Sequence, residues 1–128
     1  LSKQAAKLFA DLKAISGHGE YVFQNGHDPK KPMSPAAINA SLKRMGYDTQ
    51  KDITAHGFRA MARTILHERL NIDPYIIEHQ LAHKVPDALG AAYNRTKFIE
   101  QRTAMMQAWA DYLDELKAGA KVIPFKQA

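Results

Sequence analysis

Cysteine is absent from the 128-residue chain, which excludes disulfide bonds, thiolate metal sites and cysteine nucleophiles. Long apolar runs are absent too, because Lys, Arg or Glu interrupts every candidate before the ~18 residues that span a membrane. Nothing near Leu1 resembles a signal peptide. The composition, 45% hydrophobic and 24% charged, is typical of one ordinary globular domain and excludes intrinsic disorder.

Acidic residues are fewer than basic ones. Asp and Glu number 13 against 18 Lys and Arg, which gives a net charge of +5. A positive field favours a polyanionic partner through long-range steering and phosphate contacts. Many basic domains bind nothing anionic, so composition leaves nucleic acid as one candidate partner only. Six histidines is a high number for so short a chain.

Helical signals dominate the sequence, with no internal repeat and at most a short strand or two. Capping residues, with glycine and proline stops, predict helices from Ser2 to Gly17, from Ser34 to Met45, over 55–70 behind Thr54, from Asp73 to Pro86 and over 96–118. One stripe of the last helix carries the apolar residues Phe98, Met105, Trp109, Tyr112 and Leu116. We therefore expect a mainly α domain over residues 1–118, followed by an apolar tail over 119–128.

His56 and Arg59 lie at the start of the third predicted helix, three residues apart on neighbouring turns. With Arg63 they fall on the side of the helix opposite Phe58. Free backbone N–H groups and the helix dipole add positive potential at this end, so the pair is suited to binding phosphate. The alternative is an ordinary solvated polar face.

His79 and His83 are four residues apart, a spacing that can place two imidazoles on one metal ion. The residues between them lack the glutamate of a zinc protease, and the nearby carboxylates Glu78 and Asp87 have no diagnostic spacing. Packing of His79 in the core is the simpler interpretation.

Tyr93 comes ten residues after His83 and directly follows Gly90-Ala91-Ala92. A tyrosine in this position is usually a packing anchor for the next helix. Here the small residues clear space around it and Arg95 follows closely, so a chemical role stays open.

His56-Gly57-Phe58-Arg59, Leu81-Ala82-His83 and Tyr93 together resemble the signature of the tyrosine recombinases, and most closely that of prophage and genomic-island integrases. The family signature is His-x-x-Arg, then Leu-Gly-His, then a nucleophilic Tyr usually nine residues later. Here Ala82 replaces the glycine, and the interval to the tyrosine is ten residues. The resemblance extends over nearly the whole chain and implies the helical C-terminal part of the catalytic fold.

By this resemblance, Tyr93 is the nucleophile and Arg59, His56 and His83 assist it. Attack on a DNA phosphodiester would form a 3′-phosphotyrosyl bond and release a 5′ hydroxyl, so no cofactor and no metal is expected. Arg59 and His83 would donate to the non-bridging oxygens, and His56 would help through hydrogen bonding and the tyrosine proton. Further DNA contacts are expected from Lys84, Arg95 and Arg63.

The resemblance also implies site-specific recombination, for integration or excision, between double-stranded DNA attachment sites held by a tetramer of identical subunits. The expected setting is the bacterial cytoplasm, at the nucleoid when DNA is bound, with no membrane partner. Two family residues, an arginine in an Arg-x-x-Glu context and a lysine on a β-hairpin, have no counterpart here. We therefore expect a fragment of the catalytic domain that is inactive alone.

Two other classes of protein stay open on the sequence. The first is a non-catalytic DNA-binding module in which residues 34–45 and 54–70 form a helix-turn-helix, although a connection of about eight residues exceeds the usual three or four. The second is a zinc-dependent enzyme that uses His79 and His83 as ligands.

Overall fold

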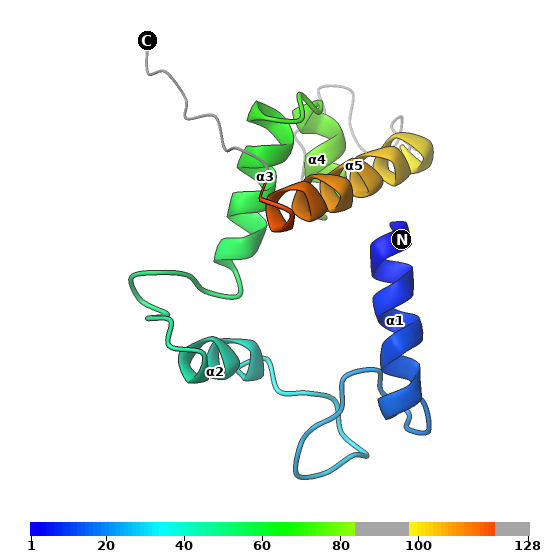
Figure 1. Cartoon of the computed structure of the whole chain (residues 1–128), viewed down its shortest axis with the longest axis vertical. Helices are drawn as coiled ribbons and strands as arrows, with labels where there is room; N and C mark the ends of the chain where they lie inside the picture. Colours follow the sequence, from blue (N-terminus) through cyan, green and yellow to red (C-terminus); the bar gives the residue numbers. More distant parts are fainter. Residues whose placement is uncertain (84–97, 120–128) are drawn as a thin grey trace. The chain divides into compact units, whose positions relative to one another are not determined.

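The computed structural model describes residues 1–83 and 98–119, and these residues are mainly helical, as the sequence predicts. Figure 1 shows the helices in chain order: α1 (Lys3–Ser16), α2 (Ala37–Arg44), α3 (Gly57–Glu68), α4 (Pro74–Gln80) and α5 (Ile99–Lys117). The described residues contain no strand, and their one isolated bridge joins Gln24 to Pro32 in the loop between α1 and α2. Residues 120–128 of the expected tail lie outside the described part.

Three of the predicted caps are present. The Ser2 hydroxyl accepts a hydrogen bond from the backbone N–H of Ala5 at the start of α1 (3.2 Å). The Thr54 hydroxyl accepts from the N–H of Gly57 at the start of α3 (2.9 Å). The Asp73 carboxylate accepts from the N–H of Tyr75 in α4 (2.8 Å), and Pro74 occupies the first helical position. Each cap satisfies one of the N–H groups that a helix start leaves unpaired.

Several predicted boundaries were wrong by a few residues, for local reasons. Helix α2 begins at Ala37 rather than Pro35, because Ser34 first forms a turn in which its carbonyl accepts from the N–H of Ala37 (2.9 Å). Helix α4 ends at Gln80 because Ala82 adopts a φ of 55°. Phe98 adopts a φ of 48°, so α5 begins only at Ile99. Left-handed residues cannot continue a right-handed helix.

The described chain divides into two compact units. One contains Leu1–Ala5 together with the described residues from Leu66 onward, and the other is Ala6–Ile65. In the first unit α4 packs against α5 (Figure 1). Its core is Leu66, Ile77 and Met105, with exposed fractions of 4%, 1% and 1%, surrounded by the half-buried Leu70, Ile72, Ile76, Leu81, Met106 and Trp109.

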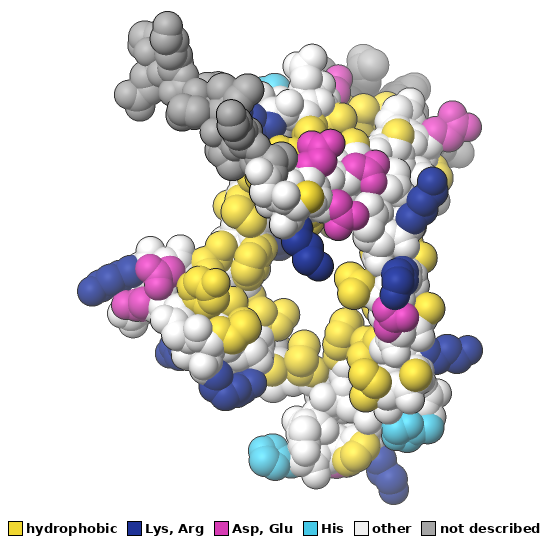
Figure 2. All heavy atoms as spheres, in the orientation of Figure 1, with side chains coloured by type: hydrophobic (Ala, Val, Ile, Leu, Met, Phe, Trp, Pro, Cys, Tyr) yellow, Lys and Arg dark blue, Asp and Glu magenta, His cyan; other side chains and the backbone are white. Residues whose placement is uncertain are grey.

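The start of α1 is tied to α5 within this first unit. The backbone N–H of Lys3 donates to Gln107 Oε1 (2.9 Å). The Gln4 amide donates to Asp111 Oδ1 (2.7 Å) and Asp114 Oδ2 (2.9 Å). Acidic side chains gather over this part of α5 (Figure 2), so a neutral amide is a suitable partner for them.

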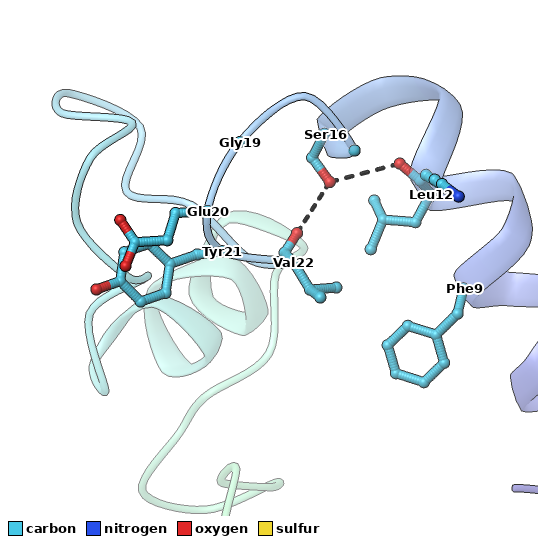
Figure 3. Close-up of a pocket in the computed structure, with 9 residues that line it drawn as sticks. Phe9, Leu12, Ser16, Gly19, Glu20, Tyr21 and Val22 are labelled. Atoms are coloured by element: carbon cyan, nitrogen blue, oxygen red, sulfur yellow. Dashed lines mark hydrogen bonds between the residues drawn. The ribbon is translucent and has the colours of Figure 1, made fainter.

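The second unit buries little apolar surface of its own, and Leu42 is its buried hydrophobic residue among those the structure describes. The Ser16 hydroxyl bonds to the carbonyls of Leu12 (3.4 Å) and Val22 (2.9 Å), which folds the chain back after α1 (Figure 3). This turn borders an apolar hollow of about 250 Å³ lined in part by Phe9 and Tyr21. No described helix of either unit is long and apolar enough to cross a membrane.

Candidate functional site

His56 and Arg59 lie at the N-terminus of α3, and both are exposed. The His56 carbonyl accepts from the backbone N–H of Arg59 (3.0 Å), so the two residues belong to the same first turn. The turn is held from outside as well, because Asn39 Oδ1 in α2 accepts from the N–H of Ala55 (2.8 Å). An imidazole and a guanidinium therefore lie at a capped helix start, where the dipole favours an anion.

Arg63 lies one turn further along α3 and is also exposed. The side of α3 that carries Phe58 is only partly covered. Phe58 is 41% exposed and Ile65 is half-buried, whereas the buried Leu66 follows Arg59 by seven residues and lies within about 20° of it around the helix. The exposed basic residues therefore lie on the first turns of α3, and the same side of the helix becomes buried at Leu66, toward the C-terminal end.

His83 follows α4, where the chain reverses in the hydrogen-bond pattern of a Schellman turn. The N–H of His83 donates to the carbonyl of Glu78 (3.1 Å), and the N–H of Ala82 donates to the carbonyl of His79 (3.3 Å). Ala82 occupies the left-handed position of this turn, with a φ of 55°. Glycine, which stands at this position in the Leu-Gly-His signature, adopts that conformation without a Cβ clash.

The side chains of Glu78 and His83 also meet, through Oε2 of Glu78 and Nδ1 of His83. An ionised carboxylate can only accept a hydrogen bond, so this contact assigns a proton to Nδ1. Nε2 is then the ring nitrogen that is not bonded to Glu78. On the sequence alone, Glu78 is a candidate only for metal binding, and its pairing with His83 is not predicted. The signal is the five-residue separation across a helix end, which becomes meaningful only once the turn at Ala82 is known.

His79 has a different environment. Its ring packs against Tyr75 and Phe98, with ring centroids 4.8 Å and 5.2 Å away. Its buried Nε2 has no hydrogen-bond partner among the residues described. This is the packing that the simpler interpretation predicted for His79. Within residues 1–83 and 98–119, no group of three or more His, Cys, Asp or Glu side chains is arranged to hold a metal ion.

The predicted site residues are distributed over the chain as follows. His56, Arg59 and Arg63 belong to the unit Ala6–Ile65, and His83 belongs to the unit that contains α4 and α5. Tyr93, Lys84 and Arg95 lie outside the described residues. The roles of all seven therefore stay predictions.

The chain is similar to integrases of phages and prophages. It is 45% identical over 115 residues to an integrase of Enterobacteria phage P4, which covers 89% of this chain and 26% of that protein. It is 41% identical over 119 residues to the prophage integrase IntZ of Escherichia coli K12, and 37% identical over 123 residues to the prophage integrase IntA of the same strain. These two alignments cover 93% and 96% of this chain and 29% of each relative.

The predicted resemblance to prophage integrases is thereby confirmed. The chain spans little more than a quarter of the length of the curated relatives it matches. No protein-family model matches the chain, and no solved structure matches it.

Proposed function

We propose that this chain is part of the catalytic domain of a tyrosine site-specific recombinase, which cuts and rejoins DNA through a 3′-phosphotyrosyl intermediate. The observation that carries the proposal is the order His56, Arg59, His83 and Tyr93 in a chain that is 45% identical to a phage integrase. The exposed positions of His56, Arg59 and His83 at helix ends support it, since a DNA phosphate has to reach these side chains.

Each residue type suits one part of the reaction. The Tyr93 oxygen attacks the phosphorus, and the bond from the phosphorus to the 5′ oxygen of the next nucleotide breaks. The tyrosine gives up one proton and the leaving 5′ oxygen takes up one from solvent, so one phosphoester replaces another. A tyrosine has an ordinary pKa of ~10 and needs a group such as His56 to take its proton. Arg59 presents a planar fork of donors to the non-bridging oxygens, and His83 adds a further nitrogen. A 5′ hydroxyl from a partner strand then reverses the step.

The proposal includes the assembly in which this chemistry takes place. Four copies of the full-length protein would bring two double-stranded attachment sites together in the bacterial cytoplasm, at the nucleoid. Lys84, Arg95 and Arg63 would contact the DNA backbone, which matches the net charge of +5. The 128-residue chain alone would be inactive, because its sequence lacks the Arg-x-x-Glu arginine and the hairpin lysine of the family signature.

The test uses a suicide duplex, nicked near the cleavage position so that the released fragment diffuses away and the covalent adduct accumulates. The full-length protein should form a protein–DNA adduct, and Tyr93→Phe should form none. Tyr47→Phe is the matched control, since Tyr47 is 50% exposed and lies in the connection between α2 and α3. An undiminished adduct with Tyr93→Phe would show that another residue is the nucleophile.

A non-catalytic DNA-binding module is the second candidate, on the basic charge alone. The structure weakens its helix-turn-helix form, because residues 45–56, twelve in all, separate α2 from α3, against the usual three or four. Such a module would bind the same duplex with an affinity that falls steeply as the salt concentration rises. It would form no covalent adduct, with or without Tyr93.

A further inference from the structure

Glu78 and His83 are joined through both backbone and side chain. The backbone N–H of His83 donates to the Glu78 carbonyl at 3.1 Å, and its Nδ1 is bonded to Oε2 of the same residue. The turn at Ala82 makes this possible, because its left-handed φ of 55° directs the chain back over the last turn of α4. The backbone bond fixes the position of His83 against the end of α4, and the side-chain contact fixes the orientation of its ring.

The side chains of Glu78 and His83 differ in how far they are exposed to solvent. Glu78 is 19% exposed, whereas His83 is 48% exposed. The carboxylate is thus the more sheltered partner, anchored on α4, and the imidazole is the partner that solvent and large ligands can reach. Since Nδ1 faces Glu78, the ring offers Nε2 to anything that approaches from outside.

We propose that Glu78 is a positioning residue, which fixes the ring of His83 so that Nε2 is the nitrogen presented to the scissile phosphate. The role assigned to His83 rests on the proposed function, but the orientation rests only on the contacts of α4 and its C-terminal turn. The carboxylate keeps a proton on Nδ1 of the ring. It also balances the positive charge of the doubly protonated ring, the form in which the Nε2–H can donate to a phosphate oxygen. Glu78 itself does not touch the DNA.

Nitrogen NMR of the 128-residue chain tests the orientation without any DNA. In the wild type, the neutral His83 ring should be protonated at Nδ1. In Glu78→Ala it should shift toward the Nε2–H tautomer, which imidazoles in water favour. Glu68→Gln is the control, because it removes an exposed negative charge at the end of α3 and should leave the His83 shifts unchanged.

Adduct formation by the full-length protein tests the consequence. Glu78→Ala should slow formation of the covalent adduct about tenfold or more, with DNA affinity unchanged, and Glu78→Gln should retain more activity because its amide oxygen can still accept from Nδ1. An unchanged tautomer in Glu78→Ala would overturn the proposal, as would a changed tautomer with an unchanged rate. Absence of adduct from the wild type would instead overturn the proposed function, and the NMR result would then decide the orientation by itself.

Discussion

Asn39 in α2 holds the turn that precedes the His56–Arg59 helix start, because its side-chain oxygen accepts the backbone N–H of Ala55 at 2.8 Å. Sixteen residues separate the two partners along the chain, and both are partly buried. A half-buried N–H group that loses its acceptor costs free energy, since little water can replace the bond. Asn39 is therefore a support for the candidate phosphate site that sequence reasoning did not identify.

Replacement of Asn39 by Ala should lower the free energy of unfolding by about 1–2 kcal/mol. Urea denaturation of the 128-residue chain measures this. The amide NMR signals of His56 and Arg59 should move in the same variant, because the turn before them is released. Asn39→Asp retains an acceptor oxygen and should cost less. Equal stability of Asn39→Ala and the wild type would mean that the bond contributes nothing.

Ala82→Gly should stabilise the chain. A non-glycine residue at a φ of 55° has its Cβ close to the following backbone, which costs about 1–2 kcal/mol, and glycine removes this cost while adding some flexibility to the unfolded chain. We expect a net gain of about 1 kcal/mol in urea denaturation. The control has the opposite sign: Ala104→Gly, at an exposed position inside α5, should cost about 1 kcal/mol. Destabilisation by both variants would contradict the left-handed conformation of Ala82.

Hydrogen bonds from Gln4 and then Gln107, helped by the charge of Lys3, lower the pKa of the Asp111 carboxyl from its ordinary value of 3.8. Loss of Gln4 in a Gln4→Ala variant should raise this pKa toward 3.8, and a carbon NMR titration of the carboxyl measures the change. Gln101→Ala, exposed on the same helix, is the control and should have no effect.

The lowered pKa of Asp111 determines how the stability of the fold changes with pH. A carboxyl whose pKa is lower in the folded state stabilises the fold above its unfolded pKa, and the contribution disappears as the pH falls through the folded pKa. The link between α1 and α5 should therefore weaken only in acid below pH 3.8. Weakening of this link near neutral pH would have to come from another group.

Arg59→Lys should impair the chemistry and leave the fold intact. The substitution retains the positive charge but removes the planar fork of donors, so adduct formation by the full-length protein should fall about a hundredfold or more. The melting temperature should stay unchanged, because Arg59 is exposed at the start of α3. Arg44→Lys, on α2, is the matched control. A loss of the fold in Arg59→Lys would instead identify a structural arginine.

The helix starts were the most predictable part of the fold. Ser2, Thr54 and Asp73 each cap a helix as the sequence indicates, because the capping oxygen and its N–H partner lie within three residues of each other. The end of α4 before Ala82 and the start of α5 after Phe98 were not predictable in this way. Neither Ala82 nor Phe98 is a glycine, so the residue type does not predict the left-handed conformation that both adopt.

For the candidate site too, some features could be predicted from the sequence and others could not. Residue types and their order in the chain, from His56 to Tyr93, indicate the chemistry without any structure, since a reaction needs particular functional groups. The orientation of His83 does not follow from them, because it depends on how the turn after α4 brings Glu78 to its ring.

By itself, the sequence determined the mainly helical class, the capped helix starts and the resemblance to integrases, all of which depend on residues close together in the chain or on their types. Only the tertiary structure decided which distant groups meet, as the side chain of Gln4 meets that of Asp111 across 107 residues and the side chain of Asn39 meets the backbone N–H of Ala55 across 16. Such contacts form only when packing has already brought the elements together, so no local pattern encodes them. Packing, through the Leu66, Ile77 and Met105 core, is what brings α4 and α5 together.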